Sequence, residues 1–231
     1  MANRRSTPPL SAPVIGVPAE PDLAPEHKQA IVSALRWAWQ ELCSSHMTAA
    51  REDSEEVVTA LIERLLNDRI DGKRRAPGIE DFETVTRGSK VRTADSRIEK
   101  QPDLHFRPPP YRNVRQSSDW AWFVECKLIN GAASVEAYCV RGVQRFTSGE
   151  YGACMPTAAL LAYVRDGQQP FDALNPKLPG RFGTVSHTPG PNRDLSQSRH
   201  LRNGLPQPCV DIELSHIWLQ VAPVAGRRDA V

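Results

Sequence analysis

The stretch Trp120-Ala-Trp-Phe-Val-Glu-Cys-Lys-Leu128 decides the fold, because it is the strongest strand signal in the chain. It is rich in aromatic and β-branched residues, a serine-containing turn precedes it, and Asn130-Gly131 follows it. Side chains alternate across a strand, so Glu125 and Lys127 point to the same face of the expected sheet. Burying two opposite charges is costly unless they form an ion pair or hold a metal ion and a substrate. The strand therefore ends either in a functional site or in a structural ion pair.

The overall composition is that of an ordinary soluble globular protein. With 231 residues, 40% hydrophobic and 24% charged, the chain can form one α/β domain with a buried core and additional tails. A formal charge of +2 is too small to indicate nucleic-acid binding, so only local clusters can do so. No apolar run is long enough for a membrane span, and the first residues lack the apolar segment of a secretory signal. Five cysteines without a Cys-x-x-Cys pair argue against a disulfide framework and a zinc site, and favour a cytoplasmic location.

The chain is expected to form a single domain over residues 26–222, between a disordered proline-rich tail (1–25) and a short C-terminal tail (223–231). Periodicity and turn residues predict its elements in this order: helices at 26–46 and 54–70, strands at 82–86, 97–106 and 120–128, a helix at 134–146, and strands at 157–164 and 210–221. A short helix is the alternative for 157–164. The segment 166–207, rich in Gly, Pro, Asn and Ser, is interpreted as a long irregular loop. This order predicts a mixed sheet with helices packed on both faces.

Two carboxylates stand near the ends of two successive predicted strands. Asp103 follows Pro102 near the end of one, and Glu125 lies 22 positions later, two residues before Lys127. Carboxylates on adjacent strands can hold Mg²⁺ or Mn²⁺ through hard oxygen ligands and leave sites for water and a phosphate oxygen. A nearby ammonium can orient or deprotonate the attacking water and stabilise the charge that develops on phosphorus. These groups are what metal-dependent phosphodiester cleavage requires.

Pro102-Asp103 followed by Glu125-Cys126-Lys127 resembles the motif of the PD-(D/E)xK nuclease superfamily, which has the restriction-endonuclease-like fold. The resemblance spans roughly residues 50–165 and implies a core of helix, three strands, helix and strand (αβββαβ). It also implies that Asp103 and Glu125 ligate Mg²⁺ or Mn²⁺ and that Lys127 is the catalytic lysine. Two other acidic-x-Lys triplets in the chain lack both the preceding Pro-Asp strand and the following helix. The alternative is a structural ion pair of Glu125 with Lys127, with Asp103 capping a turn.

Many members of that superfamily add a glutamate from the helix that precedes the sheet. Glu52, Glu55 and Glu56 compete for this role in the second predicted helix. Glu55 shares the apolar stripe of Val58 and Ile62, which is expected to face the core. We therefore predict that Glu55 belongs to the catalytic set. The alternative is that these acidic residues only complement the dipole of the helix.

Basic and polar residues in three segments could bind a nucleic-acid backbone without reading its sequence. The resemblance implies that residues of the helix after the lysine lie near the scissile phosphate. The residues are Arg107, Arg112 and Arg115 on the loop between the two active-site strands, Arg141, Gln144 and Arg145 on the helix after Lys127, and Arg181, Arg193, Arg199, His200 and Arg202 within 166–207. Solvated loops and an ordinary polar helix face are the alternative.

These features predict an Mg²⁺- or Mn²⁺-dependent endonuclease, with DNA preferred over RNA as its substrate. Residues 138–163 also resemble uncharacterised bacterial nuclease-like proteins, some linked to phage defence. That likeness implies an antiviral effector, whose activity a protein partner or a homo-oligomer is expected to control. One alternative is a catalytically inactive nuclease-fold subunit that binds nucleic acid or a protein partner in a defence complex. The ion-pair alternative predicts no metal binding at Asp103 and Glu125.

Overall fold

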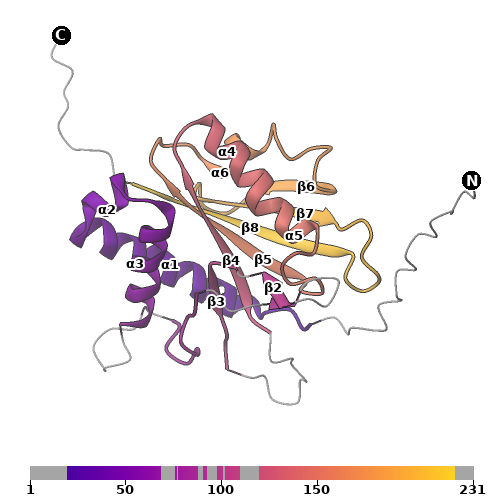
Figure 1. Ribbon diagram of the computed structural model, residues 1–231, viewed down its shortest axis with the longest axis horizontal. Coiled ribbons are helices and arrows are strands. Elements are labelled where there is room, and N and C mark those ends of the chain that lie inside the picture. The colour runs from indigo at the N-terminus through magenta and orange to yellow at the C-terminus, as the bar shows by residue number, and fades with distance from the viewer. Residues whose placement is uncertain are drawn as a thin grey trace, which may run out of the picture.

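The chain is an α/β protein with a six-stranded mixed sheet that has helices packed on both faces (Figure 1). A computed structural model describes residues 20–68, 76, 78–87, 91–92, 98–100, 102–109 and 120–221. Most of the predicted N-terminal tail, the whole C-terminal tail, Arg112 and Arg115 lie outside these residues. Within them, no helix combines the length and the apolar character that a bilayer crossing requires.

The sheet has the strand order β3-β4-β5-β8-β7-β6, in which β4, β5 and β8 are parallel and the outer strands pair antiparallel with their neighbours. Its strands are β3 (Leu104–Phe106), β4 (Trp122–Ile129), β5 (Thr157–Val164), β6 (Thr184–Pro189), β7 (Leu195–Leu201) and β8 (Asp211–Gln220). Every residue of β5 is buried, as expected for a central parallel strand covered on both faces. Two short strands, β1 (Val91–Arg92) and β2 (Ile98–Lys100), form a separate antiparallel pair.

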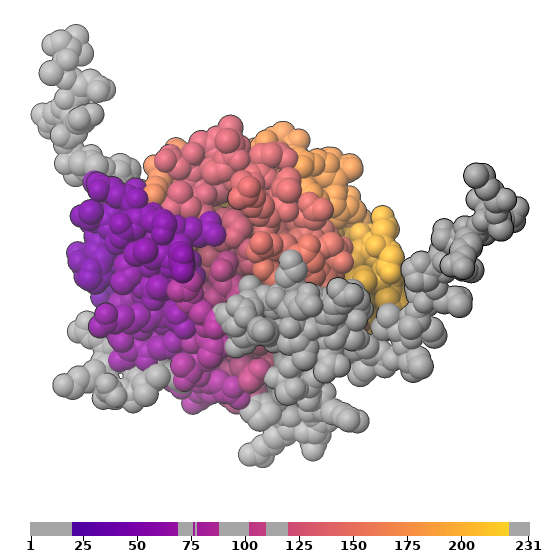
Figure 2. Space-filling view, in the orientation of Figure 1, coloured from indigo at the N-terminus to yellow at the C-terminus, as the bar shows by residue number. Residues whose placement is uncertain are grey.

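Two groups of helices cover the two faces of the sheet. One group comprises α1 (Pro25–Ser45), α2 (Met47–Glu52) and α3 (Glu55–Asn67), and the other α4 (Ala132–Tyr138), a π-helical turn η1 (Cys139–Val143), α5 (Gln144–Thr147) and α6 (Pro170–Leu174). On the first face Trp39 stacks on Tyr163 with ring centroids 5.4 Å apart. On the second face Tyr138 meets Trp218 edge-on at 5.5 Å. The surfaces of α1–α3 (indigo to violet) and of the α4–α5 layer (pink) adjoin in Figure 2.

The helix after β4 widens at η1, where it passes closest to the sheet. A Cβ atom on Gly142 would lie 2.6 Å from Leu160 Cδ2, so a side chain there would push the helix away from β5. The wide turn also keeps Ala137, Arg141 and Arg145, each four residues apart, on one side of the helix, where a regular α-helix would drift. The predicted helix at 134–146 is therefore present, with a local change of pitch that the sequence pattern did not indicate.

The residues just before α1 are packed, so the predicted disordered tail is wrong for positions 20–25. Leu23 is buried, Trp120 Nε1 donates to the Pro21 carbonyl at 2.7 Å, and Thr157 Oγ1 donates to Asp22 Oδ1 at 2.7 Å. The Glu20 N–H also donates to the Cys154 carbonyl at 3.3 Å, so apolar and polar contacts together hold this segment in place. The proline-rich composition concealed them.

Two of the predicted strands differ from the structure. The segment 97–106 is divided into β2 and β3, and between them lies Pro102, which has no N–H to continue a ladder. The segment 82–86 forms only an isolated bridge, from Thr86 to His105. The backbone of Val85 in this segment hydrogen-bonds to a side chain and not to a neighbouring strand. The Asn67 side chain donates to the Val85 carbonyl at 2.7 Å and accepts from the Val85 N–H at 2.9 Å. The other strand predictions, including 120–128 and 157–164, are confirmed, and the helix alternative for 157–164 is wrong.

The prediction of an irregular loop at 166–207 is wrong, because this segment contains α6, β6 and β7. In β7 the inward positions are Ser196, Ser198 and His200, and the outward ones include Leu201. Apolar alternation, the usual sign of a strand, is therefore absent from this segment. Polar side chains face inward because they hydrogen-bond to one another.

A hydrogen-bonded network fills the space between β7, β8 and α4. Ser198 Oγ lies 2.7 Å from Nε2 of both His200 and His216. His216 Nδ1 lies 2.8 Å from the Tyr138 hydroxyl, and all four side chains are buried. Burial lowers the pKa of His200 to about 4 and that of His216 well below its ordinary value, so both imidazoles are neutral at pH 7. This network joins the outer half of the sheet to the helix that lines the pocket described below.

The prediction that the cysteines form no disulfide is also wrong. Cys154, just before β5, and Cys209, just before β8, form a disulfide across 55 positions of sequence. The two strands are neighbours only in the folded sheet, so no short spacing pattern revealed the pair. Among the described cysteines, Cys43, Cys126 and Cys139 are free.

We expect Ser198→Ala to lower the free energy of unfolding by about 2 to 4 kcal/mol, because two buried imidazole nitrogens lose their partner. Ser186→Ala is the matched control, since Ser186 is exposed on the adjacent strand β6 and should change stability by less than about 0.5 kcal/mol. Urea denaturation of both variants measures the difference. Equal stability of the two variants would contradict the role assigned to Ser198.

Candidate active site

The site forms beside the start of strand β3, beyond which the edge of β4 is left without a strand partner. β3 pairs with β4 only from Trp122 to Val124, and alternate N–H groups of β4 point toward the β3 side. The next such N–H, of Cys126, donates to Asp103 Oδ2 at 2.7 Å. The one after it, of Leu128, donates to Glu55 Oε2 at 2.9 Å. Two carboxylates thus take the place of the missing strand, and both are fixed by the backbone of β4.

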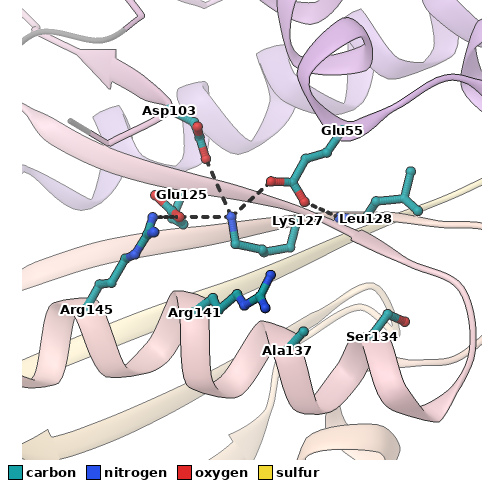
Figure 3. Close-up of a pocket in the computed structure, with 9 residues that line it drawn as sticks. All are labelled: Glu55, Asp103, Glu125, Lys127, Leu128, Ser134, Ala137, Arg141 and Arg145. Carbon is teal, nitrogen blue, oxygen red and sulfur yellow. Dashed lines mark hydrogen bonds and ion pairs between the residues drawn. The ribbon is translucent and has the colours of Figure 1, made fainter. Parts of the chain in front are cut away.

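The ammonium of Lys127 lies among three carboxylates. Its Nζ is 2.9 Å from Glu125 Oε1, 3.0 Å from Glu55 Oε1 and 3.9 Å from Asp103 Oδ2 (Figure 3). It also donates to the Cys126 carbonyl at 2.6 Å. The structure therefore brings together the four residues predicted as catalytic, which come from β4, α3 and the start of β3. Of the three glutamates that competed for the helix position, Glu55 reaches the ammonium.

Arg145 is the second cation at the buried end of the site. Its Nη1 lies 2.6 Å from Glu125 Oε1 and donates to the Tyr151 hydroxyl at 2.8 Å. Lys127 and Arg145 therefore share one oxygen of Glu125, whose side chain is 1% exposed. The other oxygen, Oε2, is buried and has no hydrogen-bond partner among the described residues. Tyr151 lies in the segment 138–163 that carries the resemblance to nuclease-like proteins, but no role at the site was predicted for it.

Two of the carboxylates, those of Glu125 and Asp103, have raised pKa values. Burial, and then the charge of Asp103, raise the pKa of Glu125 to about 7, although Lys127 and Arg145 act in the opposite direction. Burial also raises the pKa of Asp103. The pKa of Lys127 is raised because the attraction of Glu125 and Glu55 outweighs its desolvation, so it carries a charge at neutral pH. The buried end of the site is close to accepting a proton at pH 7.

A pocket of about 310 Å³ opens over these residues, between β4 and the α4–α5 helix. Its lining comprises Glu55, Asp103, Glu125, Lys127, Leu128, Ser134, Ala137, Arg141 and Arg145. Arg141 extends into it from the helix, and its guanidinium makes no hydrogen bond or ion pair with any described residue (Figure 3). The pocket thus combines a buried anionic end with one exposed, unpaired cation.

Two other described residues predicted to bind nucleic acid, Gln144 and Arg107, do not line this pocket. Gln144 is exposed but not among the lining residues. Arg107 donates to the Trp120 carbonyl at 3.2 Å and pairs with Glu83.

The residues named within 166–207 do not form a free basic cluster. Arg181 pairs with Glu136 at 2.6 Å and Arg199 with Asp211 at 2.7 Å. Arg202 is buried and donates to backbone carbonyls, including that of Gly152. Of the predicted second phosphate-binding cluster, Arg181, Arg199, Arg202 and the buried His200 thus have structural partners, whereas Arg193 is exposed.

The chemistry of the donor set fits a hard divalent cation, while its present geometry is that of an ion-pair cluster. Among the described residues, no three His, Cys, Asp or Glu side chains are arranged as a metal-binding group. The carboxylates surround the Lys127 ammonium instead. Even so, Glu55, Asp103 and Glu125 outnumber the cations Lys127 and Arg145 when all are ionised, and Glu125 Oε2 lacks a partner. Carboxylate oxygens of this kind are the ligands that Mg²⁺ and Mn²⁺ prefer.

Comparison with known proteins adds no further information: no family model, curated protein or solved structure matches the chain.

We expect the ionisation of Glu125 to destabilise the fold as the pH rises. Its pKa is raised in the folded state, so the folded chain holds a proton that the unfolded chain releases between about pH 4.5 and pH 7. Relative to Glu125→Gln, wild type should lose on the order of 2 kcal/mol of unfolding free energy between about pH 5 and pH 8.

Urea denaturation of both proteins across this range measures the effect. The buried histidines, whose pKa values are lowered, stabilise the fold as the pH rises and therefore act with the opposite sign. Because they are present in both proteins, the difference between the two isolates Glu125. Parallel pH profiles would show that Glu125 is ionised throughout.

Proposed function

We propose that this protein is a metal-dependent nuclease built on a restriction-endonuclease-like core. The observation that carries the proposal is the convergence of Glu55, Asp103 and Glu125 on Lys127, in a pocket that also holds the unpaired guanidinium of Arg141. The carboxylates come from the Asp and Glu-x-Lys positions of the motif and from the preceding helix. A purely structural ion pair gives no reason for three carboxylates in an open pocket.

In this proposal Asp103 and Glu125 hold Mg²⁺ or Mn²⁺. When bound, such an ion polarises a phosphate oxygen and lowers the pKa of a bound water. The fold holds both carboxylates at the pocket. The Cys126 N–H fixes Asp103 by a hydrogen bond. Glu125 projects from β4, whose neighbouring strand β5 is buried along its whole length. Glu55 is held by the Leu128 N–H and keeps Lys127 directed into the pocket.

Lys127 acts as a stabiliser of charge and not as a general base. Its pKa is raised, and its three donor hydrogens face Glu125, Glu55 and the Cys126 carbonyl. An ammonium in this position can attract the phosphate and stabilise the negative charge of the transition state. Abstraction of a proton from water would require it to be neutral, which this surrounding of carboxylates opposes.

Arg141 is the residue we propose for backbone phosphate contact. It is exposed, unpaired among the described residues and four residues before Arg145, so a phosphate in the pocket would be within reach of a guanidinium and an ammonium. Such contacts position a nucleic acid without reading bases. DNA as the preferred substrate, a controlling partner and a role in phage defence stay predictions.

A non-catalytic nucleic-acid-binding module of the same architecture is the second candidate. It is favoured by the saturation of Glu125 Oε1 by two cations and by the absence of a preformed metal-binding group among the described residues. In that case Arg141 would still bind phosphate, but divalent ions would not be needed. The two candidates differ in whether the pocket cleaves what it binds.

We expect the full chain to cleave DNA in the presence of Mg²⁺ or Mn²⁺ and to be inactive in EDTA. Glu125→Gln and Lys127→Ala should each lower the cleavage rate by about 100-fold or more, because each removes a group that acts on the transition state. Supercoiled, linear and single-stranded DNA and RNA are the substrates to assay. Binding without cleavage under every metal would support the second candidate, and full activity of both variants would overturn the assignment of the site.

We expect Glu55→Gln to lower the cleavage rate by about 10-fold or more, because Lys127 loses one of its anionic partners and can leave its position. Glu56→Gln is the matched control: Glu56 is the next residue of the same helix, is exposed and does not line the pocket. Steady-state cleavage rates of the two variants give the comparison. Equal losses would mean that the charge at the start of α3, and not the contact of Glu55, is what matters.

A further inference from the structure

The contacts of Arg145 differ from those of the other pocket arginine and indicate a separate role. Arg145 Nη1 lies 2.6 Å from Glu125 Oε1 and 2.8 Å from the Tyr151 hydroxyl, whereas Arg141 has no such partner among the described residues. Both of these contacts come from the same nitrogen of Arg145, and its side chain is 36% exposed. It therefore reaches from the mouth of the pocket to the buried carboxylate.

In this arrangement the carboxylate of Glu125 is not free to ligate a divalent cation. Its Oε1 is shared by two cations, and a metal ion placed beside it would lie close to the guanidinium charge. Lys127 is anchored by further contacts with Glu55 and the Cys126 carbonyl. Besides Glu125, Arg145 donates to the Tyr151 hydroxyl, lies 5.6 Å from the centroid of the Tyr151 ring and is attracted by Glu150 and Asp103. Its side chain is 36% exposed against 12% for Lys127, so Arg145 is the cation that can turn toward solvent.

We propose that Arg145 is the built-in counter-cation of Glu125, which a divalent metal ion displaces and which then turns to the phosphate of the substrate. This inference rests on the proposed function and adds a positioning residue that couples the two ligands. With its guanidinium released, Arg145 lies one helical turn from Arg141 and adds a second cation for the backbone phosphate. Because coupling between two ligands is reciprocal, bound nucleic acid strengthens metal binding by drawing Arg145 away from Glu125.

The test is a titration of the full chain with Mn²⁺, followed by electron paramagnetic resonance, at about pH 8, which is above the pKa of about 7 of Glu125. Arg145→Gln should bind Mn²⁺ at least about tenfold more tightly than wild type, because a positive charge next to the ligand is removed. Arg145→Lys, which keeps the charge, should stay closer to wild type. Arg141→Gln is the matched control for a charge on the same helix that does not contact Glu125, and should change the affinity by less than about threefold.

Tyr151→Phe provides a second route, in case Arg145→Gln does not fold. It removes one of the two anchors of Arg145 and should tighten Mn²⁺ binding by a smaller factor than Arg145→Gln. Circular dichroism of each variant verifies folding. Unchanged or weaker Mn²⁺ affinity in folded Arg145→Gln, or in Tyr151→Phe if the first variant is unfolded, would overturn the proposal.

The outcome also separates this inference from the proposed function. If wild type binds Mn²⁺ and cleaves nucleic acid but the variants bind it no more tightly, only the role of Arg145 is wrong. If neither wild type nor any variant binds Mn²⁺, the metal-dependent nuclease and the role of Arg145 are both wrong. Tighter binding in Arg145→Gln together with a lower cleavage rate supports both.

Discussion

The start of strand β3 only at Leu104, opposite Val124, is the constraint on which the site depends. It leaves the N–H groups of Cys126 and Leu128 without a strand partner, and an unpaired buried N–H is unfavourable. The Asp103 and Glu55 carboxylates satisfy these groups and are thereby fixed in place. The acidic residues are thus part of the sheet as well as of the pocket. This double use explains how side chains from distant parts of the sequence meet at one edge with defined positions.

Much of the central fold followed from local patterns. The strands at 120–128 and 157–164 and the helices before the sheet are strongly apolar or periodic, so their burial is visible in the sequence. β7 was missed because its inward residues are Ser and His, which need partners from β6, β8 and α4 to be buried. The disulfide was missed for the same reason, since only the order of the sheet makes Cys154 and Cys209 neighbours.

The pocket residues, too, were only partly predictable from the sequence. Asp103, Glu125 and Lys127 could be named because strand alternation and the resemblance indicate one face, and Glu55 because it shares an apolar stripe. The partner of each side chain could not be predicted. Arg145 was expected to contact phosphate, and the structure pairs it with Glu125 and Tyr151. Tyr151 has no pattern of its own, and the π-helical turn that keeps Arg141 and Arg145 together depends on how closely Gly142 approaches the sheet.

Tyr138, His216, Ser198 and His200 form a chain of hydrogen bonds in which the direction of donation is fixed. Among the contacts of His200 Nδ1 is the Phe182 carbonyl, which can only accept, so Nδ1 carries the proton and Nε2 accepts from the Ser198 hydroxyl. Ser198 then accepts from His216 Nε2–H, and His216 Nδ1 accepts from the Tyr138 hydroxyl. Each tautomer fixes the next, so no member can reverse alone. Strands β7 and β8 and the pocket helix therefore share one arrangement of protons.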